Sequence, residues 1–137
     1  MTTQMQFEVQ STYVNVSADE EPLNESAGTA LSSGTVKRHF EGGIVGDSVA
    51  AVLIARSRPD RLGYVATDSF TGRVGDRQGN FVFQHGGSID RGALESSFGY
   101  VVPGSGTDEL SGLRGEVRIE FTPPSTHTLT LRYDFDG

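Results

Sequence analysis

Apolar and polar residues alternate along most of this chain, and glycine, proline or aspartate interrupts the alternation at short intervals. Because successive side chains of a β-strand point to opposite faces, a period of two predicts strands with one buried face. The clearest case is residues 113–121, where apolar residues and glycine alternate with Arg114, Glu116, Arg118 and Glu120. No segment has the 3.6-residue period of an amphipathic helix, so the chain should fold almost entirely as strands.

The interruptions divide the chain into eight predicted strands, at residues 4–16, 29–41, 47–57, 62–73, 80–86, 93–102, 113–121 and 128–136. Short connections favour a single all-β domain over residues 1–137, an eight-stranded antiparallel up-and-down β-barrel. Closing the sheet removes its edge strands and leaves room inside for side chains or one small ligand. A two-layer sandwich is the alternative, but the nearly uniform short hairpins favour the barrel.

The glycine-rich segment 102–116 should close one end of this barrel. It reads VPGSGTDELSGLRGE, in which residues 107–110 can form a single helical turn. Leu110 and Leu113 would then point back into the barrel and plug that end. The other end would be the mouth, overhung by the polar residues 17–28. Loops of that length are usually functional or disordered, so we consider both a lid and a solvated loop.

Composition excludes several classes of function. The net charge is −7, and the eleven lysine and arginine residues are scattered instead of forming the patch that nucleic-acid binding needs. The longest apolar run, residues 49–55, is too short to cross a bilayer, and the first residues do not resemble a secretory signal. We therefore expect no nucleic-acid or membrane partner. Cysteine is absent, which suits a cytoplasmic protein.

Metal ions and cofactors are not expected either. The three histidines, His39, His85 and His127, are isolated, and none has the close spacing of metal ligands on one strand or helix. No glycine-rich run is followed by the Lys-Ser/Thr of a phosphate-binding loop.

Three residues are candidates for catalysis: Tyr64, His85 and Tyr100. His85 shares a strand face with Phe81 and Phe83, so all three should point inward, and an imidazole can act as acid or base near neutral pH. The more conservative interpretation is a structural histidine bonded to a backbone carbonyl. The alternation also places both tyrosines inward, where a phenol could polarise a carbonyl, although ordinary packing explains them as well.

A second set of residues should contact a ligand: Phe81, Phe83, Phe98, Tyr133 and Arg58. Arg58 belongs to a group of arginines near the predicted mouth that could receive an acidic head group, although nearby aspartates make surface ion pairs an equal explanation. Asp68 shares the inward face of Tyr64. A buried carboxylate is costly unless it is paired, so Asp68 is either a base or, as we favour, a residue at the rim.

Two segments resemble a known family. Residues 81–87 (FVFQHGG) and 101–115 (VVPGSGTDELSGLRG) are similar to those of a bacterial family of unknown function, DUF3224, and similarity at residues 7–9, Gly42, Gly46 and 131–135 extends it nearly end to end. That family is similar in fold to plant allene oxide cyclase and the dirigent proteins, which are eight-stranded barrels. The broader class includes bacterial cyclases of polyketide intermediates. The resemblance thus implies an interior cavity as the place of function.

The chain departs from the family pattern at two positions. The family commonly has tryptophan on the first strand and just before the Val-Val-Pro-Gly segment, where this chain has Tyr13 or Val14 and Gly99. If those indoles point inward, the cavity of this protein is larger.

The sequence therefore favours a cofactor-free cyclase or isomerase for a small apolar molecule, plausibly polyketide-derived. Holding a flexible chain in a reactive conformation can supply much of the acceleration without a catalytic motif. The alternatives are a non-catalytic barrel that binds a small molecule and a structural oligomer with a filled core. Pairing of the outer faces in a homodimer is a further expectation.

Overall fold

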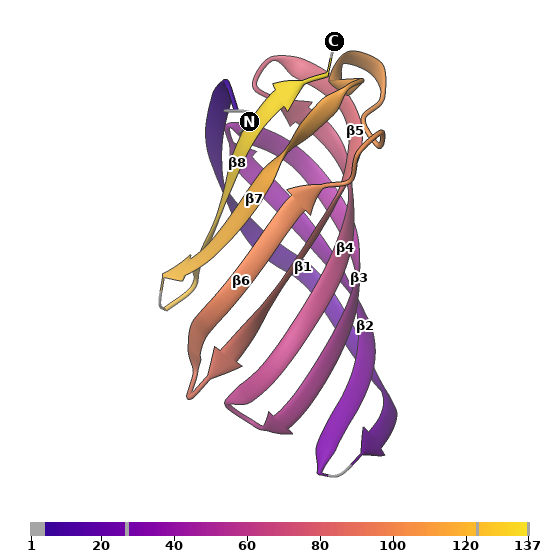
Figure 1. The fold of residues 1–137 in the computed structure, drawn as a ribbon, viewed down its shortest axis with the longest axis vertical. Coiled ribbons are helices and arrows are strands. Elements are labelled where there is room, and N and C mark those ends of the chain that lie inside the picture. The colour runs from indigo at the N-terminus through magenta and orange to yellow at the C-terminus, as the bar shows by residue number, and fades with distance from the viewer. Residues whose placement is uncertain (1–4, 27, 123, 137) are drawn as a thin grey trace, which may run out of the picture.

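Eight antiparallel strands make up nearly all of the computed structural model, which describes residues 5–26, 28–122 and 124–136 (Figure 1). The strands are β1 (Phe7–Ser26), β2 (Thr29–Gly42), β3 (Ile44–Arg58), β4 (Arg61–Val74), β5 (Arg77–Asp90), β6 (Ala93–Val101), β7 (Leu113–Thr122) and β8 (Thr126–Phe135). They are hydrogen-bonded in chain order, and β1 pairs with β8 to close a barrel. The predicted eight-stranded antiparallel barrel is confirmed.

The alternation of the sequence becomes the inside and outside of this barrel. In β4, Tyr64, Ala66, Asp68 and Phe70 face the interior, whereas Val65 and Ser69 between them are exposed. Neighbouring strands continue the inner face, since Phe70 pairs with Ser48 and Phe81, and Ala66 pairs with Val52 and His85.

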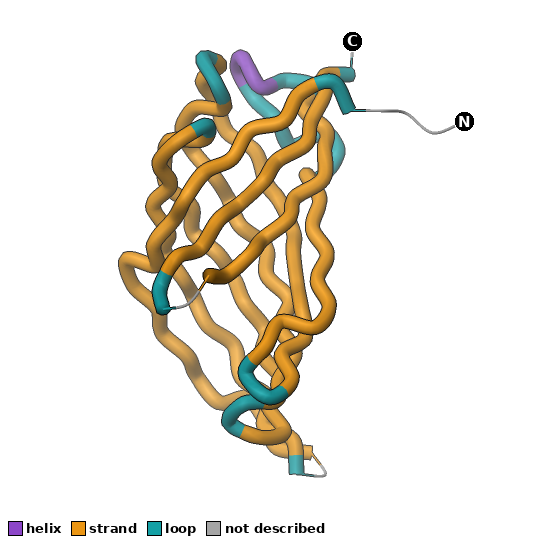
Figure 2. Tube along the Cα trace, turned by 90° about the vertical axis from the view of Figure 1, so that its left-hand side faces the viewer, coloured by secondary structure: helices purple, strands orange, loops and turns teal. Residues whose placement is uncertain are grey.

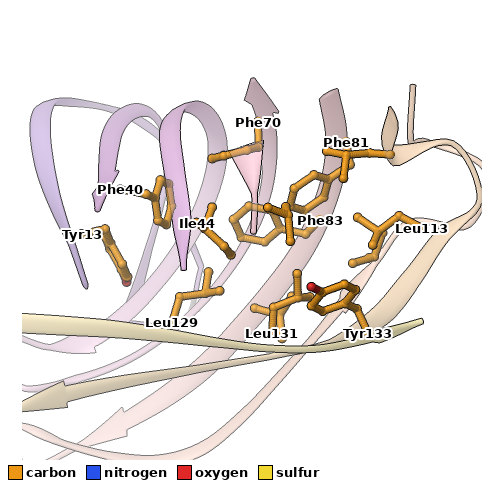
Figure 3. Packing of buried hydrophobic residues seen from close by; sticks show 14 residues of the cluster. Tyr13, Phe40, Ile44, Phe70, Phe81, Phe83, Leu113, Leu129, Leu131 and Tyr133 are labelled. Carbon is orange, nitrogen blue, oxygen red and sulfur yellow. The ribbon is translucent and has the colours of Figure 1, made fainter. Parts of the chain in front are cut away.

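One end of the barrel is closed by an apolar cluster (Figure 3). Leu110, in the short 3₁₀ helix η1 (Asp108–Leu110), and Leu113 are almost completely buried in it. Figure 2 shows this helix at the end of the barrel where the C-terminus lies. Gly106 is required here, because a Cβ would collide with the backbone oxygen of Leu110. The predicted helical turn and leucine plug are confirmed.

The predicted loop over the mouth does not exist, because most of residues 17–28 continue β1. Ser17–Ser26 of β1 pair with Thr29–Lys37 of β2, and the resulting hairpin extends beyond the other strands (Figure 1). Residues 17–25 of this extension are exposed, so their composition is mostly polar and resembles that of a loop. The register shifts between Pro22 and Asn24, which is where an edge strand tolerates proline.

At the open end of the barrel, opposite the apolar cluster, the wall is shorter on the side of β7 and β8. The β7–β8 hairpin is short, and β8 pairs with β1 only from Phe7 to Tyr13 among the described residues. β6 and β7 meet at a single register position, Tyr100 with Glu116. Gly99 permits this approach, because a Cβ there would collide with the backbone oxygen of Val117.

As for membrane insertion, the described part of the chain contains no helix with the length and apolarity to span a bilayer.

Candidate functional site

A cavity of about 410 Å³ lies inside the barrel between the apolar cluster and the mouth. Its wall consists mainly of apolar side chains from the inner faces of the strands, with polar groups from five residues. The lining residues are Tyr13, Val36, Arg38, Val52, Ile54, Leu62, Tyr64, His85, Ile89, Gly92, Leu94, Ile119, Phe121 and His127. Other hollows lie against the outer face of the sheet, beside Leu53, Val65 and Phe98. We place the candidate site in the interior, where the hydrogen-bonded acid–base groups are.

Asp68 lies at the inner end of this cavity and is completely buried. Its carboxylate accepts three hydrogen bonds, from Arg38 Nε at 2.9 Å, Ser48 Oγ at 2.7 Å and His85 Nε2 at 2.8 Å. Burial by itself would raise the pKa of Asp68, but the hydrogen bond from His85 and the charge of Arg38 outweigh it and hold the pKa below its usual value. Asp68 is therefore ionised, and the prediction that it lies at the rim is wrong.

His85 connects this carboxylate to the cavity. A carboxylate can only accept, so the Nε2 that faces Asp68 carries a proton, and in the neutral ring Nδ1 is an acceptor. Nδ1 lies 3.4 Å from the hydroxyl of Tyr64. The ring packs against Phe83, with centroids 5.5 Å apart. His85 points inward as predicted, but its partners are a carboxylate and a phenol instead of a backbone carbonyl.

Tyr64 presents its hydroxyl to the cavity at the outer end of this chain of hydrogen bonds. Burial raises the pKa of the phenol, and the charge of Arg38 only partly opposes that effect. Tyr64 is thus a neutral hydrogen-bond donor at physiological pH. Asp68, His85 and Tyr64 together form a chain that can move or hold a proton at the cavity wall.

The opposite wall holds two residues that sequence reasoning did not select, Tyr13 and His127. Their rings stack at 5.0 Å across the β1–β8 closure, and the guanidinium of Arg38 lies 5.6 Å from the Tyr13 ring centroid. Burial raises the pKa of Tyr13 to about 12 and lowers the pKa of His127, with the charge of Arg38 adding to the effect on the histidine. The alternation of β1 could have indicated that Tyr13 points inward, but its partner depends on how the barrel closes.

Two predicted site residues lie outside the barrel. Phe98 and Tyr100 are on the outer face of β6, where they are about half exposed, and Tyr100 donates a hydrogen bond to Gln84 Oε1 at 2.7 Å. The inner face of β6 carries Gly99 and Val101 instead, because the backbone of β7 occupies the space beside Gly99. The predicted inward orientation of Phe98 and Tyr100 is therefore wrong.

The remaining predicted residues are not on the cavity wall. Phe81, Phe83 and Tyr133 point inward as expected, but they belong to the cluster at the closed end. Arg58 is exposed. Of the other arginines near the mouth, Arg56 pairs with Glu20 and Arg61 pairs with Asp90, so ion pairs explain them.

The site offers proton transfer and hydrogen bonding as its chemistry. Across residues 5–26, 28–122 and 124–136, no three histidine, aspartate or glutamate side chains are grouped so that they could hold a metal ion.

Comparison with known proteins identifies a family and finds a similar solved structure. The family described as "Protein of unknown function (DUF3224)" matches residues 6–133. The crystal structure of a protein with unknown function from the DUF3224 family of Shewanella oneidensis MR-1 is similar, with a TM-score of 0.80 and 27% sequence identity. The similarity covers 96% of this chain and 98% of that chain. No curated protein matches.

Proposed function

This chain belongs to the DUF3224 family of proteins of unknown function, and from its interior site we propose that it is a cofactor-free isomerase or cyclase of a small apolar carbonyl compound. The similarity to allene oxide cyclase stays a prediction. The observation that carries the proposal is the chain of hydrogen bonds from Asp68 through His85 to Tyr64 at the wall of an apolar cavity.

In this proposal His85 is the base and Tyr64 is the hydrogen-bond donor. Nδ1 of His85 accepts a proton from the carbon next to the substrate carbonyl, and the electron pair of that C–H bond forms the C=C bond of an enolate. Tyr64 donates a hydrogen bond to the enolate oxygen, and ionised Asp68 stabilises the imidazolium. Returning the proton from His85 to another carbon gives an isomer. Attack of the enolate carbon on a second carbonyl instead closes a ring, and the alkoxide that forms takes the proton from His85.

The cavity supplies the second requirement, an apolar site that can restrict the conformations of a flexible chain. Val52, Ile54, Ile119 and Leu94 are among the residues that make most of its wall apolar. Holding reacting groups together in such a site can contribute several kcal/mol, of the order of 7–11 in well-oriented cases.

Exchange of α-hydrogens of 2-octanone in D₂O, followed by mass spectrometry, tests the proposal without knowledge of the natural substrate. We expect exchange above the buffer rate, a decrease of about 100-fold or more in His85→Gln, and a smaller decrease in Tyr64→Phe. Tyr100→Phe is the matched control, because that phenol lies outside the barrel. Exchange at the buffer rate, or full exchange in His85→Gln, would contradict the proposal.

A non-catalytic binding barrel is the second candidate. The adjoining aromatic rings of Tyr13, His127 and Phe121 favour it, since they provide a contact surface that requires no chemistry. Binding of 2-octanone detected by NMR, together with exchange no faster than in buffer, would favour this function over the isomerase.

A further inference from the structure

We infer that the cavity binds enolisable 1,3-dicarbonyl compounds with apolar arms, and that the hydroxyls of Tyr13 and Tyr64, beside Arg38, hold the enolate oxygens. This inference rests on the proposed function in one respect, because His85 is the base that receives the proton. It adds the substrate class and a new binding residue, Tyr13.

The first step is the position of Tyr13, which the chain of hydrogen bonds described above does not use. Its ring is 5% exposed and packs against Phe40, at a centroid distance of 5.1 Å (Figure 3). It also packs against His127, at a centroid distance of 5.0 Å. The ring lines the same cavity as Tyr64. No other described residue forms a hydrogen bond with the Tyr13 hydroxyl, yet this oxygen is not sealed from the cavity and solvent. The Tyr13 hydroxyl, on a ring held in place by its neighbours, can thus donate a hydrogen bond to a molecule that enters the cavity.

The second step is the position of Arg38, which lies 5.6 Å from the Tyr13 ring centroid and lines the same cavity as Tyr64. Its Nε is bonded to Asp68 and its Nη1 to Asn15 Oδ1 at 3.0 Å, so the guanidinium cannot swing away. Burial raises the pKa of both Tyr13 and Tyr64, the charge of Arg38 lowers it on each, and the charge of Asp68 raises it on each. The same charge that favours a phenolate would favour any anionic oxygen placed beside the two hydroxyls.

The third step is the charge of the site as a whole. The titratable and charged groups that face the cavity or its inner end are Tyr13, Arg38, Tyr64, Asp68, His85 and His127. The charge of Arg38 is already balanced by Asp68, so a carboxylic acid that enters as an anion would meet no unpaired guanidinium. An enolate formed inside the cavity differs, because the proton that the substrate loses makes an imidazolium of His85 at the same time.

These steps select a substrate that enters neutral and becomes anionic inside. The proton on the carbon between two carbonyls moves to His85 Nδ1, and the C–H electron pair becomes the C=C bond of the enolate. The negative charge spreads over two oxygens, which matches two phenol donors. A 1,3-dicarbonyl loses this proton far more readily than a simple ketone, so that an imidazole paired with Asp68 is a sufficient base.

The test uses 1-phenyl-1,3-butanedione, whose enolate absorbs at a longer wavelength than the neutral forms. A spectroscopic pH titration in excess protein should give an apparent pKa for the bound diketone at least one unit below its value in buffer, a tenfold preference for the enolate. Tyr13→Phe and Tyr64→Phe should each reduce that preference about tenfold, as expected for a lost hydrogen bond to a charged group. Tyr100→Phe should behave as the wild type.

Failure of this inference can be distinguished from failure of the proposed function. An unchanged diketone pKa in the wild type, or full enolate preference in Tyr13→Phe, would overturn the inference even if 2-octanone exchange depends on His85. Enolate preference that depends on both phenols would support the inference even if 2-octanone does not exchange. Circular dichroism establishes whether each variant is folded. If Tyr13→Phe does not fold, Tyr64→Phe still tests whether a phenol hydroxyl holds the enolate oxygen.

Discussion

Replacing Arg38 by methionine tests whether the buried charges inside the barrel depend on one another. The Arg38 and Asp68 side chains are 9% and 0% exposed, and they are joined by a 2.9 Å hydrogen bond. Methionine fills a similar space but leaves the Asp68 carboxylate with only Ser48 and His85 as donors. Breaking a buried ion pair on one side costs about 3–5 kcal/mol, so we expect the free energy of unfolding to fall by that amount at neutral pH.

The pH dependence of this loss has a definite sign. The folded-state pKa of Asp68 is lowered, so the carboxylate contributes stability above its unfolded pKa of about 3.9 and loses that contribution as the pH falls through the folded pKa. In Arg38→Met the buried carboxyl loses a group that lowers its pKa, and protonation relieves it. The difference in stability between the variant and the wild type should therefore shrink on acidification.

Urea unfolding followed by far-UV circular dichroism measures these changes, since the chain has no tryptophan to report by fluorescence. Combining Arg38→Met with Asp68→Asn removes the uncompensated charge, and the double variant should be more stable than the sum of the two single changes predicts. Arg132→Met is the control, because its pair with Glu8 is exposed and should contribute at most about 1 kcal/mol. Additivity of the two single changes to within about 0.5 kcal/mol would refute the reasoning.

Three further predictions concern the closed end of the barrel, the contact between β6 and β7, and the outer surface. Leu110→Ala removes the plug and should cost about 2–5 kcal/mol in urea unfolding, whereas Leu53→Ala on the half-exposed outer face should change stability by less than about 0.5 kcal/mol. Gly99→Ala should cost about 1–3 kcal/mol, because its Cβ overlaps the backbone of β7, whereas the Cβ of Gly63→Ala meets only Gly87 O at 3.9 Å, an ordinary contact. Equal losses in the two variants would rule out a steric clash between β6 and β7. The two carboxylates that contact His39 raise its pKa, so an NMR titration should place it above the usual value. The contact contributes its full stability to the folded protein below the unfolded-state pKa of His39, and this contribution is lost as the pH rises through the raised folded-state pKa. His39→Gln should therefore flatten the dependence of unfolding free energy on pH in that range. A His39 titration at the usual pKa would contradict the contact.

The local pattern predicted the strands and the closed end correctly. Which side chains of a strand share a face depends only on their spacing along that strand, so the inner and outer residues of β7 and β8 could be predicted directly from the sequence. Likewise, the glycines and leucines of residues 102–116 indicated a tight turn with an apolar side, and the structure buries Leu110 and Leu113 at the closed end.

The failures have identifiable physical causes. The alternation of β6 could be read with Phe98 and Tyr100 on the inside, because aromatic residues are normally buried. The close approach of β7 at Gly99 reverses that choice. Residues 17–28 were expected to form a loop because they are mostly polar. Residues 17–25 are instead exposed in a hairpin that projects from the barrel, where β1 keeps its backbone hydrogen bonds with β2.

The sequence by itself determined which residues of each strand share a face, because the period of two is a property of a single strand. It thereby placed Tyr64 and His85 on inward faces and Asp68 on the same face as Tyr64, although it favoured the rim for Asp68. Only the tertiary structure decided that Asp68 is deeply buried, that Arg38 neutralises it and that Tyr13 meets His127. Those neighbours come from different strands, and the register and closure of the barrel, which depend on all eight strands together, set the distances between them.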